Sequence, residues 1–213
     1  MVNLDMAKSK TRRKIESSHR TGISWGGRAT SGSRKWNYVI VISVILALAY
    51  GAFAWSIGTV SERDFLSLAE SGKEALKQVK SLPSDGRRHL DPGETHVYRS
   101  RLPTSGPHSL TWVPPGVYEE APVPTEVVHA LEHGNVLINF DIPGAEVMKT
   151  LKAWAKLYNK QWSGLVIAPL PGLGQKVILR AWTNRLDLEI FDAGSAAAFV
   201  DAYRGRGPEH PVR

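Results

Sequence analysis

The sequence of 213 residues contains no cysteine and only three methionines. The lack of cysteine excludes disulfides, thiolate metal sites, iron–sulfur clusters, thiol catalysis and thioether attachment of haem. Met148 is the single methionine after residue 60, so a sulfur-rich copper(I) site is excluded there as well. Hydrophobic residues make up 42% of the chain and charged residues 22%, a composition that permits a folded core and excludes disorder of the whole chain.

Excess positive charge is confined to the first 35 residues. That segment holds nine of the 27 Lys and Arg residues and two of the 20 acidic ones, which leaves 18 of each sign in the remainder. Residues 1–35 also contain few apolar side chains, which predicts a disordered basic cytoplasmic tail. Because the rest of the chain is neutral, we expect it to bind no nucleic acid, since phosphate binding requires a basic surface.

An uncharged run from Tyr38 to Val60 follows the tail. At about 1.5 Å per residue, a helix of this length reaches roughly 34 Å, enough to cross a bilayer. We therefore predict a transmembrane helix at residues 36–60. The basic tail favours a cytoplasmic N-terminus and an extracytoplasmic C-terminal part, in a single-pass protein of the cell membrane. The alternative is a signal peptide cleaved after Ala54, but the apolar run continues past that residue and the basic region is long for a signal.

Two segments of contrasting composition come next. Residues 61–82 carry apolar side chains at three-to-four spacing, which predicts a stalk helix that could also pair with a second copy of the chain. Residues 83–124 contain eight prolines, which exclude long helices and leave short extended pieces. We assign residues 83–213 to one extracytoplasmic domain.

The periodicity sharpens from Pro124 onward. Helices are predicted at 124–133, 145–160 and 194–203, and strands at 135–140, 165–168 and 176–182, with a further short strand or turn at 186–191. The first two strands are joined by a helix and should be parallel. The Pro-Gly turn at 171–174 predicts a hairpin, so the third strand should be antiparallel to the second. The expected fold is α+β, a small mixed-sheet domain with helices packed on one face.

Four of the seven histidines fall between residues 96 and 133: His96, His108, His129 and His133. His129 and His133 are four residues apart on a predicted helix, so both rings point to the same side, a spacing that metal-binding histidines use. Imidazole suits zinc and copper(II). Three or four of these histidines, with Glu132 as a nearby carboxylate, could therefore hold Zn or Cu. We expect His89 and His210 to lie outside this group.

Two other interpretations of these residues stay open. Paired histidines on a helix often donate hydrogen bonds to oxygen atoms and bind no metal. The segment from His129 to His133 also matches the H-x-x-E-H pattern of inverted zinc proteases, with Glu132 as the base. That pattern needs a helix that continues, whereas Gly134 is expected to end the helix here. The sequence therefore gives little support to an enzyme.

Two glycine-rich segments resemble anion-binding loops only in part. The PGLGQ segment at 171–175 lacks the Gly-Lys-Ser/Thr ending of a P-loop. The RGRGPE segment at 204–209 could bind an anion through Arg204 and Arg206. Alternatively, it ends the last helix, with its arginines paired to nearby carboxylates.

Distinctive blocks follow one another along the second half of the chain: HVYRSRLPTSGPH (96–108), GVY (116–118), VHALEHGNVLINF (128–140), VIAPLPG (166–172), LRAW (179–182) and FVDAYRGRGPE (199–209). Together they resemble the domain-of-unknown-function family 3105, uncharacterised single-pass membrane proteins of bacteria, over roughly residues 90–209. The resemblance implies an extracytoplasmic α+β domain and carries no catalytic assignment. Two functions remain to be weighed: binding of Zn or Cu through the histidines, and a non-catalytic interaction or structural module of a cell-envelope complex.

Overall fold

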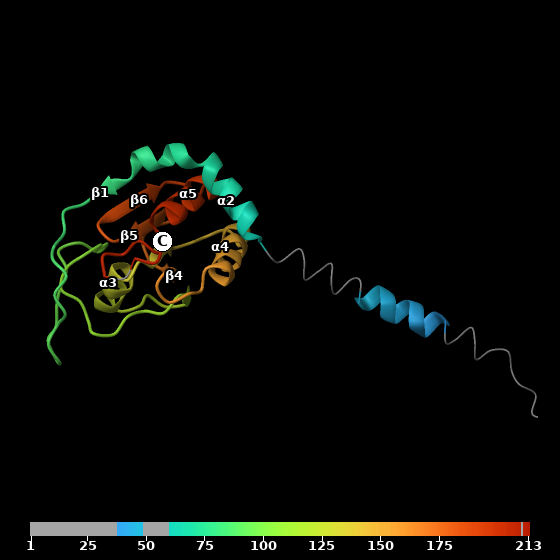
Figure 1. Cartoon of the computed structure of the whole chain (residues 1–213), viewed down its shortest axis with the longest axis horizontal. Helices are drawn as coiled ribbons and strands as arrows, with labels where there is room; N and C mark the ends of the chain where they lie inside the picture. The colour runs from blue at the N-terminus through green and yellow to red at the C-terminus, as the bar shows by residue number, and fades with distance from the viewer. Residues whose placement is uncertain (1–37, 49–59, 210) are drawn as a thin grey trace, which may run out of the picture. The chain divides into compact units, whose positions relative to one another are not determined.

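The computed structural model describes residues 38–48, 60–209 and 211–213 (Figure 1). The chain divides into two units, Met1–Ala49 and Tyr50–Arg213. The second unit contains every strand described below and all the side chains that form the candidate site.

The N-terminal unit bears on the predicted membrane anchor. Residues 38–48 form a helix whose side chains are exposed. Within the described ranges, no helix combines the length and the apolar character needed to cross a membrane. The predicted tail at 1–35 lies outside those ranges, as do residues 36–37 and 49–59 of the predicted membrane helix.

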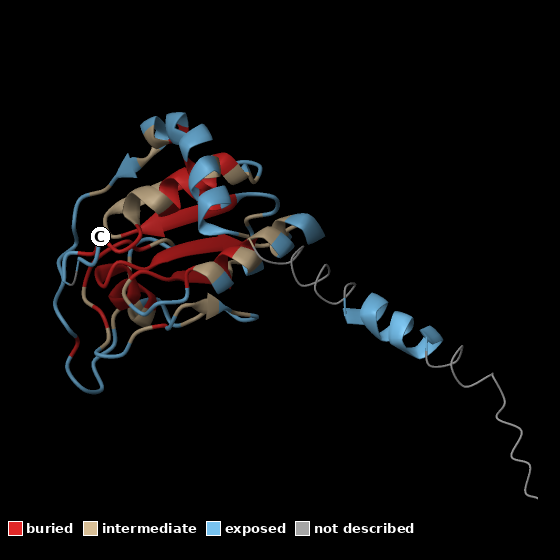
Figure 2. Ribbon diagram, turned by 45° about the vertical axis from the view of Figure 1, so that its right-hand side comes forward, coloured by how far each residue is buried: buried red, intermediate tan, exposed pale blue. Residues whose placement is uncertain are grey.

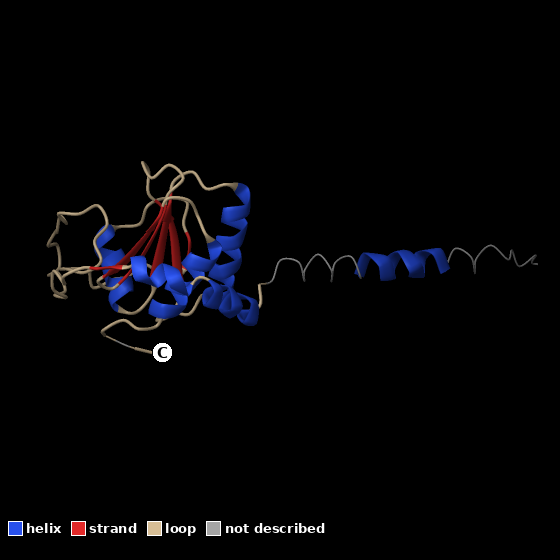
Figure 3. Ribbon diagram, turned by 90° about the horizontal axis from the view of Figure 1, so that it is seen from above, coloured by secondary structure: helices blue, strands red, loops and turns tan. Residues whose placement is uncertain are grey.

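The C-terminal unit is built on a six-stranded mixed sheet with the order β1-β6-β5-β3-β4-β2. The strands are β1 (Lys80–Ser81), β2 (Gly116–Val117), β3 (Val136–Phe140), β4 (Leu165–Pro169), β5 (Val177–Ala181) and β6 (Asn184–Leu188). The strands β2, β3 and β4 are parallel, whereas β5 is antiparallel to β3 and β6, and β6 to β1. In Figure 3 the strands lie between the helices. A mixed sheet with helices confirms the α+β class, and the parallel pairing of β3 and β4 across a helix is also confirmed.

The position of β5 differs from the prediction. It pairs with β3 and not with β4, so the PGLG segment is not a hairpin. The carboxylate of Asp141, just after β3, accepts hydrogen bonds from the backbone N–H groups of Gly172 and Gly174, each at 3.0 Å. These bonds hold the loop across the end of β3. The chain therefore leaves β4 on one side of β3 and enters β5 on the other side. The tight hairpin joins β5 to β6 instead, through Trp182 and Thr183.

Helices cover both faces of the sheet, which corrects the expectation of one covered face. Helices α2 (Glu62–Ser71), α4 (Ala145–Leu157) and α5 (Ala193–Tyr203) pack on one face in a large apolar cluster. Helix α3 (Pro124–Glu132) packs on the other. All five residues of β3 are buried. Since neighbouring side chains of a strand point to opposite faces, both faces need a cover. The central strands β3, β4 and β5 form the buried centre in Figure 2, whereas the short strands β1 and β2 are not buried.

The segment expected to form a stalk helix belongs to the core of the domain. Helix α2 begins after Ser61, whose hydroxyl caps it by accepting from the N–H of Asp64, and ends at Ser71. A 3-10 helix η1 follows at Lys73–Gln78. Phe65 is 0% exposed, and its ring packs edge-on against Trp154 at 5.1 Å between centroids. The apolar face that would pair with a second copy is therefore already used inside the domain.

Candidate metal centre

The C-terminal end of α3 carries three of the predicted site residues. His129 and Glu132 lie in its last turn, and His133 caps it. Gly134 follows with a φ of +100°, a left-handed conformation that glycine adopts without strain, as expected for a helix terminator. The sharp turn lets β3 start at once, so the imidazoles stay beside the sheet.

A close backbone contact brings the C-terminal segment to this helix end. A Cβ atom on Gly207 would lie only 2.1 Å from the carbonyl oxygen of Glu132, so glycine is required there. The N–H of Glu209 points to the same carbonyl at 3.4 Å. The contact places the Glu209 side chain near the imidazoles of α3.

A second backbone contact brings in a histidine from the proline-rich region. His89 and His108 face each other in an isolated parallel bridge. The N–H of Leu90 donates to the carbonyl of His108 at 2.7 Å, and the N–H of His108 donates to that of Arg88 at 3.0 Å. His89 therefore sits beside His108, although 19 positions separate them in the sequence.

These contacts assemble a first ligand set, formed by His89, His108, His129 and Glu132. One ligand atom from each lies within 4.8 Å of every other. His108, His129 and Glu132 are 0%, 4% and 3% exposed, whereas His89 is exposed. The ring centroids of the three histidines are 4.8 to 4.9 Å apart. Three buried ligands and one at the surface describe a site that is open on one side.

His108 is held in an orientation suited to metal binding. Its Nδ1 lies 2.9 Å from the carbonyl oxygen of Gly106, and because a carbonyl only accepts, Nδ1 is the donor. The neutral ring then has its lone pair on Nε2. That atom lies 3.0 Å from Oε2 of Glu132, and it has no hydrogen-bond partner among the described residues. A buried lone pair beside a carboxylate oxygen fits a bound cation.

The electrostatics of the other two buried ligands favour the same interpretation. Burial lowers the pKa of His129, and the nearby charge of protonated His108 lowers it further, so the neutral imidazole is favoured. Burial raises the pKa of the Glu132 carboxyl, although a protonated His108 opposes this shift. An ionised Glu132 is therefore costly without a cation, and a metal ion would supply one.

A second ligand set, formed by His129, His133 and Glu209, adjoins the first. Oε2 of Glu209 lies 2.7 Å from Nε2 of His133 and 3.9 Å from Nε2 of His129. Nδ1 of His129 points to the carbonyl of Thr111 at 3.3 Å, where it can only donate. His129 belongs to both sets and keeps one nitrogen free for a metal.

Tryptophan rings form a wall around the histidines. The ring of Trp162 packs 3.8 Å from that of His133, and Trp112 lies within 5.5 Å of both His129 and His133, measured between centroids. Such apolar walls lower the local dielectric and strengthen electrostatic contacts. On the open side, a hollow of about 290 Å³ is lined by Arg87, His89, Glu132, Pro208 and Glu209. The hollow gives a route by which an ion can reach the ligands.

The structure assembles four of the five predicted site residues and omits one. His108, His129, His133 and Glu132 lie together, whereas neither ligand set found among the described residues contains His96. The ring of His96 instead packs on Tyr98, with 4.7 Å between centroids.

Two participants were missed by sequence reasoning. His89 was expected outside the group and lies inside it, whereas His210 falls outside the described residues. No local spacing links His89 to His108, because a bridge between two irregular segments brings them together. The RGRGPE segment was considered only for its arginines, although it also carries Glu209.

The fold and the site thus define an α+β domain with a buried cluster of histidine and glutamate. Residues 89–213 match the family described as Protein of unknown function (DUF3105), and the chain belongs to that family. The match confirms the resemblance seen in the sequence. It begins at His89 and includes every residue of the two ligand sets. No curated protein and no solved structure matches the chain.

Proposed function

We propose that the domain binds a divalent transition-metal ion, Zn²⁺ or Cu²⁺, through the first ligand set. The observation that carries this proposal is the convergence of four ligand atoms within 4.8 Å of one another. They come from separate parts of the chain, so helix periodicity alone does not explain their meeting. Three imidazoles and a carboxylate are a donor set that suits zinc and copper(II).

The distances are close to those of a loaded site. Bonds of about 2.1 Å in a tetrahedral site place the ligand atoms about 3.4 Å apart. Nε2 of His108 and Oε2 of Glu132 already lie 3.0 Å apart. The ring of His89 is already 4.8 Å from that of His108, measured between centroids, and its exposed side leaves room for it to turn toward an ion. Carbonyl groups fix the distant nitrogens of His108 and His129, the arrangement by which proteins orient ligating imidazoles.

We place this domain outside the cytoplasm, behind a single-pass anchor at residues 36–60. The proposal is supported by the uncharged run from Tyr38 to Val60 and by the nine basic residues that precede it. The bilayer would then be the first partner of the chain. A metal site in this location would take its ion from the extracytoplasmic space.

A second candidate function is a non-catalytic interaction module of a cell-envelope complex. Ile142 and Ile190 are each 72% exposed. They follow β3 and β6, which are both antiparallel to β5, so the two side chains lie at the same end of the sheet. Isoleucines exposed at one end of the sheet favour contact with another protein. This function becomes the first choice if the histidines hold no metal.

The geometry gives less support to a metal-dependent hydrolase. In the H-x-x-E-H pattern the glutamate is the base that activates a water molecule and is not a metal ligand. Glu132 instead faces Nε2 of His108 at 3.0 Å and belongs to the first ligand set. Helix α3 also ends at Glu132, as the sequence predicts, so it lacks the continuation that the protease pattern needs.

The test of metal binding is elemental analysis of the full-length protein, purified in detergent without a histidine tag. The wild type should retain close to one equivalent of Zn²⁺ or Cu²⁺, and His129→Ala, which removes a ligand from both sets, should retain almost none. His96→Ala is the matched control and should retain as much as the wild type. Equal, substoichiometric metal in the wild type and in His129→Ala would refute the proposal and leave these residues as structural histidines.

A further inference from the structure

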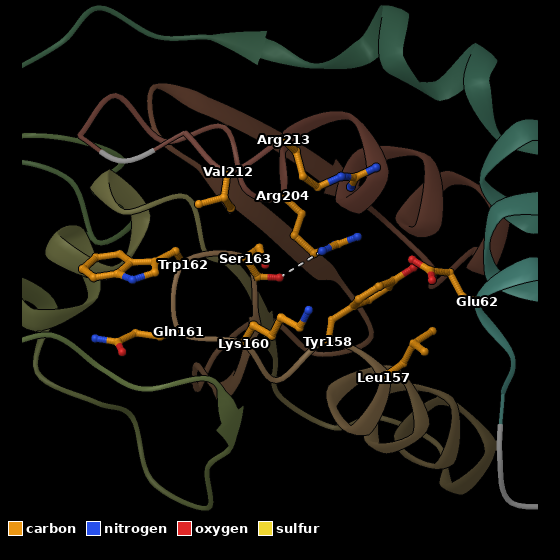
Figure 4. A pocket seen from close by; sticks show the side chains of 10 residues that line it. All are labelled: Glu62, Leu157, Tyr158, Lys160, Gln161, Trp162, Ser163, Arg204, Val212 and Arg213. Carbon is orange, nitrogen blue, oxygen red and sulfur yellow. Dashed lines mark hydrogen bonds between the residues drawn. The ribbon is translucent and has the colours of Figure 1, made fainter.

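A pocket of about 400 Å³, shown in Figure 4, has the ring of Trp162 in its wall. It is formed by the start of α2, the C-terminal end of α4, the loop that follows α4, the end of α5 and the C-terminal residues. The volume is in the range of sites for small organic ligands. We call it the Arg204 pocket, after the buried cation in its wall.

Arg204 is built into this wall. The residue is 6% exposed, and its guanidinium carbon lies 3.7 Å from the centre of the Tyr158 ring. One terminal nitrogen donates to the carbonyl of Ser163 at 3.2 Å, the bond drawn in Figure 4. This stacking and this bond fix the plane of the guanidinium group.

In the described part of the chain Arg204 has no direct ion-pair partner, although the carboxylates of Asp201 and Glu62 act on its charge from further away. Among the described residues, no carboxylate lies within ion-pair distance of Arg204, and its Nε has no hydrogen-bond partner. Asp201 forms its ion pair with Arg213, at 2.8 Å. A buried, unpaired guanidinium costs free energy, which a bound anion would recover.

The remaining groups of the pocket fit an anion with an apolar part. Its charged side chains are Lys160, Arg204, Arg213 and Glu62, so positive groups outnumber the negative one by three to one. The hydroxyl of Tyr158 is buried and has no hydrogen-bond partner among the described residues. Leu157, Val212 and the Trp162 ring complete the wall with apolar surface.

We propose that the Arg204 pocket binds a small organic anion, a carboxylate or phosphate monoester that carries an apolar ring or short chain. The anionic group lies beside Arg204 and Lys160, and the apolar part lies against Trp162. A fixed guanidinium fork matches the paired oxygens of both anion types. This inference does not depend on the metal site, although the two share a wall, since the ring of Trp162 also packs on His133.

Isothermal titration calorimetry on the full-length protein tests the proposal. The protein is first treated with EDTA, so that no anion can bind through a metal ion. Phenyl phosphate and benzoate supply the two anion types on one ring, phenol is the uncharged control, and inorganic phosphate is the control without a ring. We expect binding of phenyl phosphate or benzoate at least about tenfold tighter than that of either control. The proposal would be overturned if neither aromatic anion bound, or if phenol bound with equal affinity. Equal affinity for inorganic phosphate would show that the pocket does not recognise the apolar part of the ligand.

Variants locate the binding in the pocket. Arg204→Gln should weaken phenyl phosphate binding by about tenfold or more, because it removes a charged donor. Since Arg204 is buried and its replacement can destabilise the domain, Lys160→Gln at an exposed position gives an independent test, with an expected loss of about two- to fivefold. Lys176→Gln, whose side chain pairs with Glu189 outside the pocket, is the control and should bind as the wild type does. Unchanged affinity in Lys160→Gln, or in a folded Arg204→Gln, would contradict the assignment.

Discussion

Nε2 of His108 and Oε2 of Glu132 lie 3.0 Å apart, with both side chains almost completely buried. The imidazole is oriented by the carbonyl of Gly106, and the carboxylate is carried by the last turn of α3. A proton or a metal ion between these atoms would relieve the cost of burying the carboxylate. The metal-free domain, with a proton in this position, and the metal-bound domain should therefore respond differently to the same substitution.

Glu132→Gln is expected to preserve or raise the stability of the metal-free domain and to lower the stability of the metal-bound domain. Burial raises the pKa of Glu132 in the folded protein. A raised pKa means that the folded state binds more protons than the unfolded state, so this group lowers stability as pH rises above about 4.5. At pH 7.5 with EDTA, Glu132→Gln should therefore be at least as stable as the wild type. With Zn²⁺ at a hundred times the dissociation constant, the wild type should gain about 2.7 kcal/mol, and the variant much less.

Denaturant unfolding with and without Zn²⁺ measures both effects, and Glu126→Gln serves as the control because Glu126 belongs to neither ligand set. A variant that is less stable than the wild type in EDTA would show that Glu132 stabilises the metal-free domain as an anion. An unchanged gain with Zn²⁺ would remove Glu132 from the ligands.

Acid should destabilise the metal-free domain partly through His129. Burial, and then the charge of His108, lowers the pKa of His129 in the folded state. The unfolded state then binds more protons, so the contribution of His129 to stability is present above about pH 6.5 and is lost as pH falls below it. His129→Asn should flatten the loss of stability between pH 7 and pH 5 in EDTA. Equal slopes for the variant and the wild type would contradict this expectation.

Gly207→Ala should displace the C-terminal segment from α3. The added methyl group would lie 2.1 Å from the carbonyl oxygen of Glu132, so the backbone must move. We expect a loss of about 1–3 kcal/mol in the free energy of unfolding. Gly144→Ala is the matched control, because its Cβ meets nothing within 4 Å and its φ of −62° suits alanine. Chemical denaturation of both variants measures the difference, and equal stability would show that the segment yields easily.

The proposed topology predicts which end of the chain a protease reaches. Protease added to intact spheroplasts should digest the domain beyond Val60 and spare the basic tail at 1–35, because the uncharged run between them would cross the bilayer. Antibodies against each end detect the fragments, and a cytoplasmic protein controls for lysis. Protection of the domain would contradict the proposed orientation. A soluble mature form that begins near Trp55 would show that the apolar run is a cleaved signal and not an anchor.

Local patterns predicted the parts of the fold that local physics determines. The glycine at 134 ends α3 because only a left-handed residue lets the chain turn directly into β3. The three consecutive apolar residues that begin β3, Val136–Ile138, also contained a sign that both faces are buried, since a strand covered on one face alternates. The prediction of helices on one face overlooked that sign.

Long-range contacts determined what the sequence could not predict. The Pro-Gly turn has the same composition whether it closes a hairpin or crosses the end of β3, and the two bonds to Asp141 decide between them. The amphipathic pattern of α2 is equally suited to a stalk and to a core helix. In the site, His129 and His133 were found through helical spacing, whereas His89 required a bridge between two segments without periodicity.

His129 belongs to both ligand sets, and this limits the number of metal ions that the site can bind. While its Nδ1 donates to Thr111, one lone pair is left for two ligand sets, and one lone pair cannot serve two ions. Titration should therefore saturate at one equivalent, although the protein offers two positions. An ion that changes position would exchange His89, His108 and Glu132 for His133 and Glu209 while it stays bound to His129. The two ligand sets are therefore alternative positions for one ion, which share the imidazole of His129.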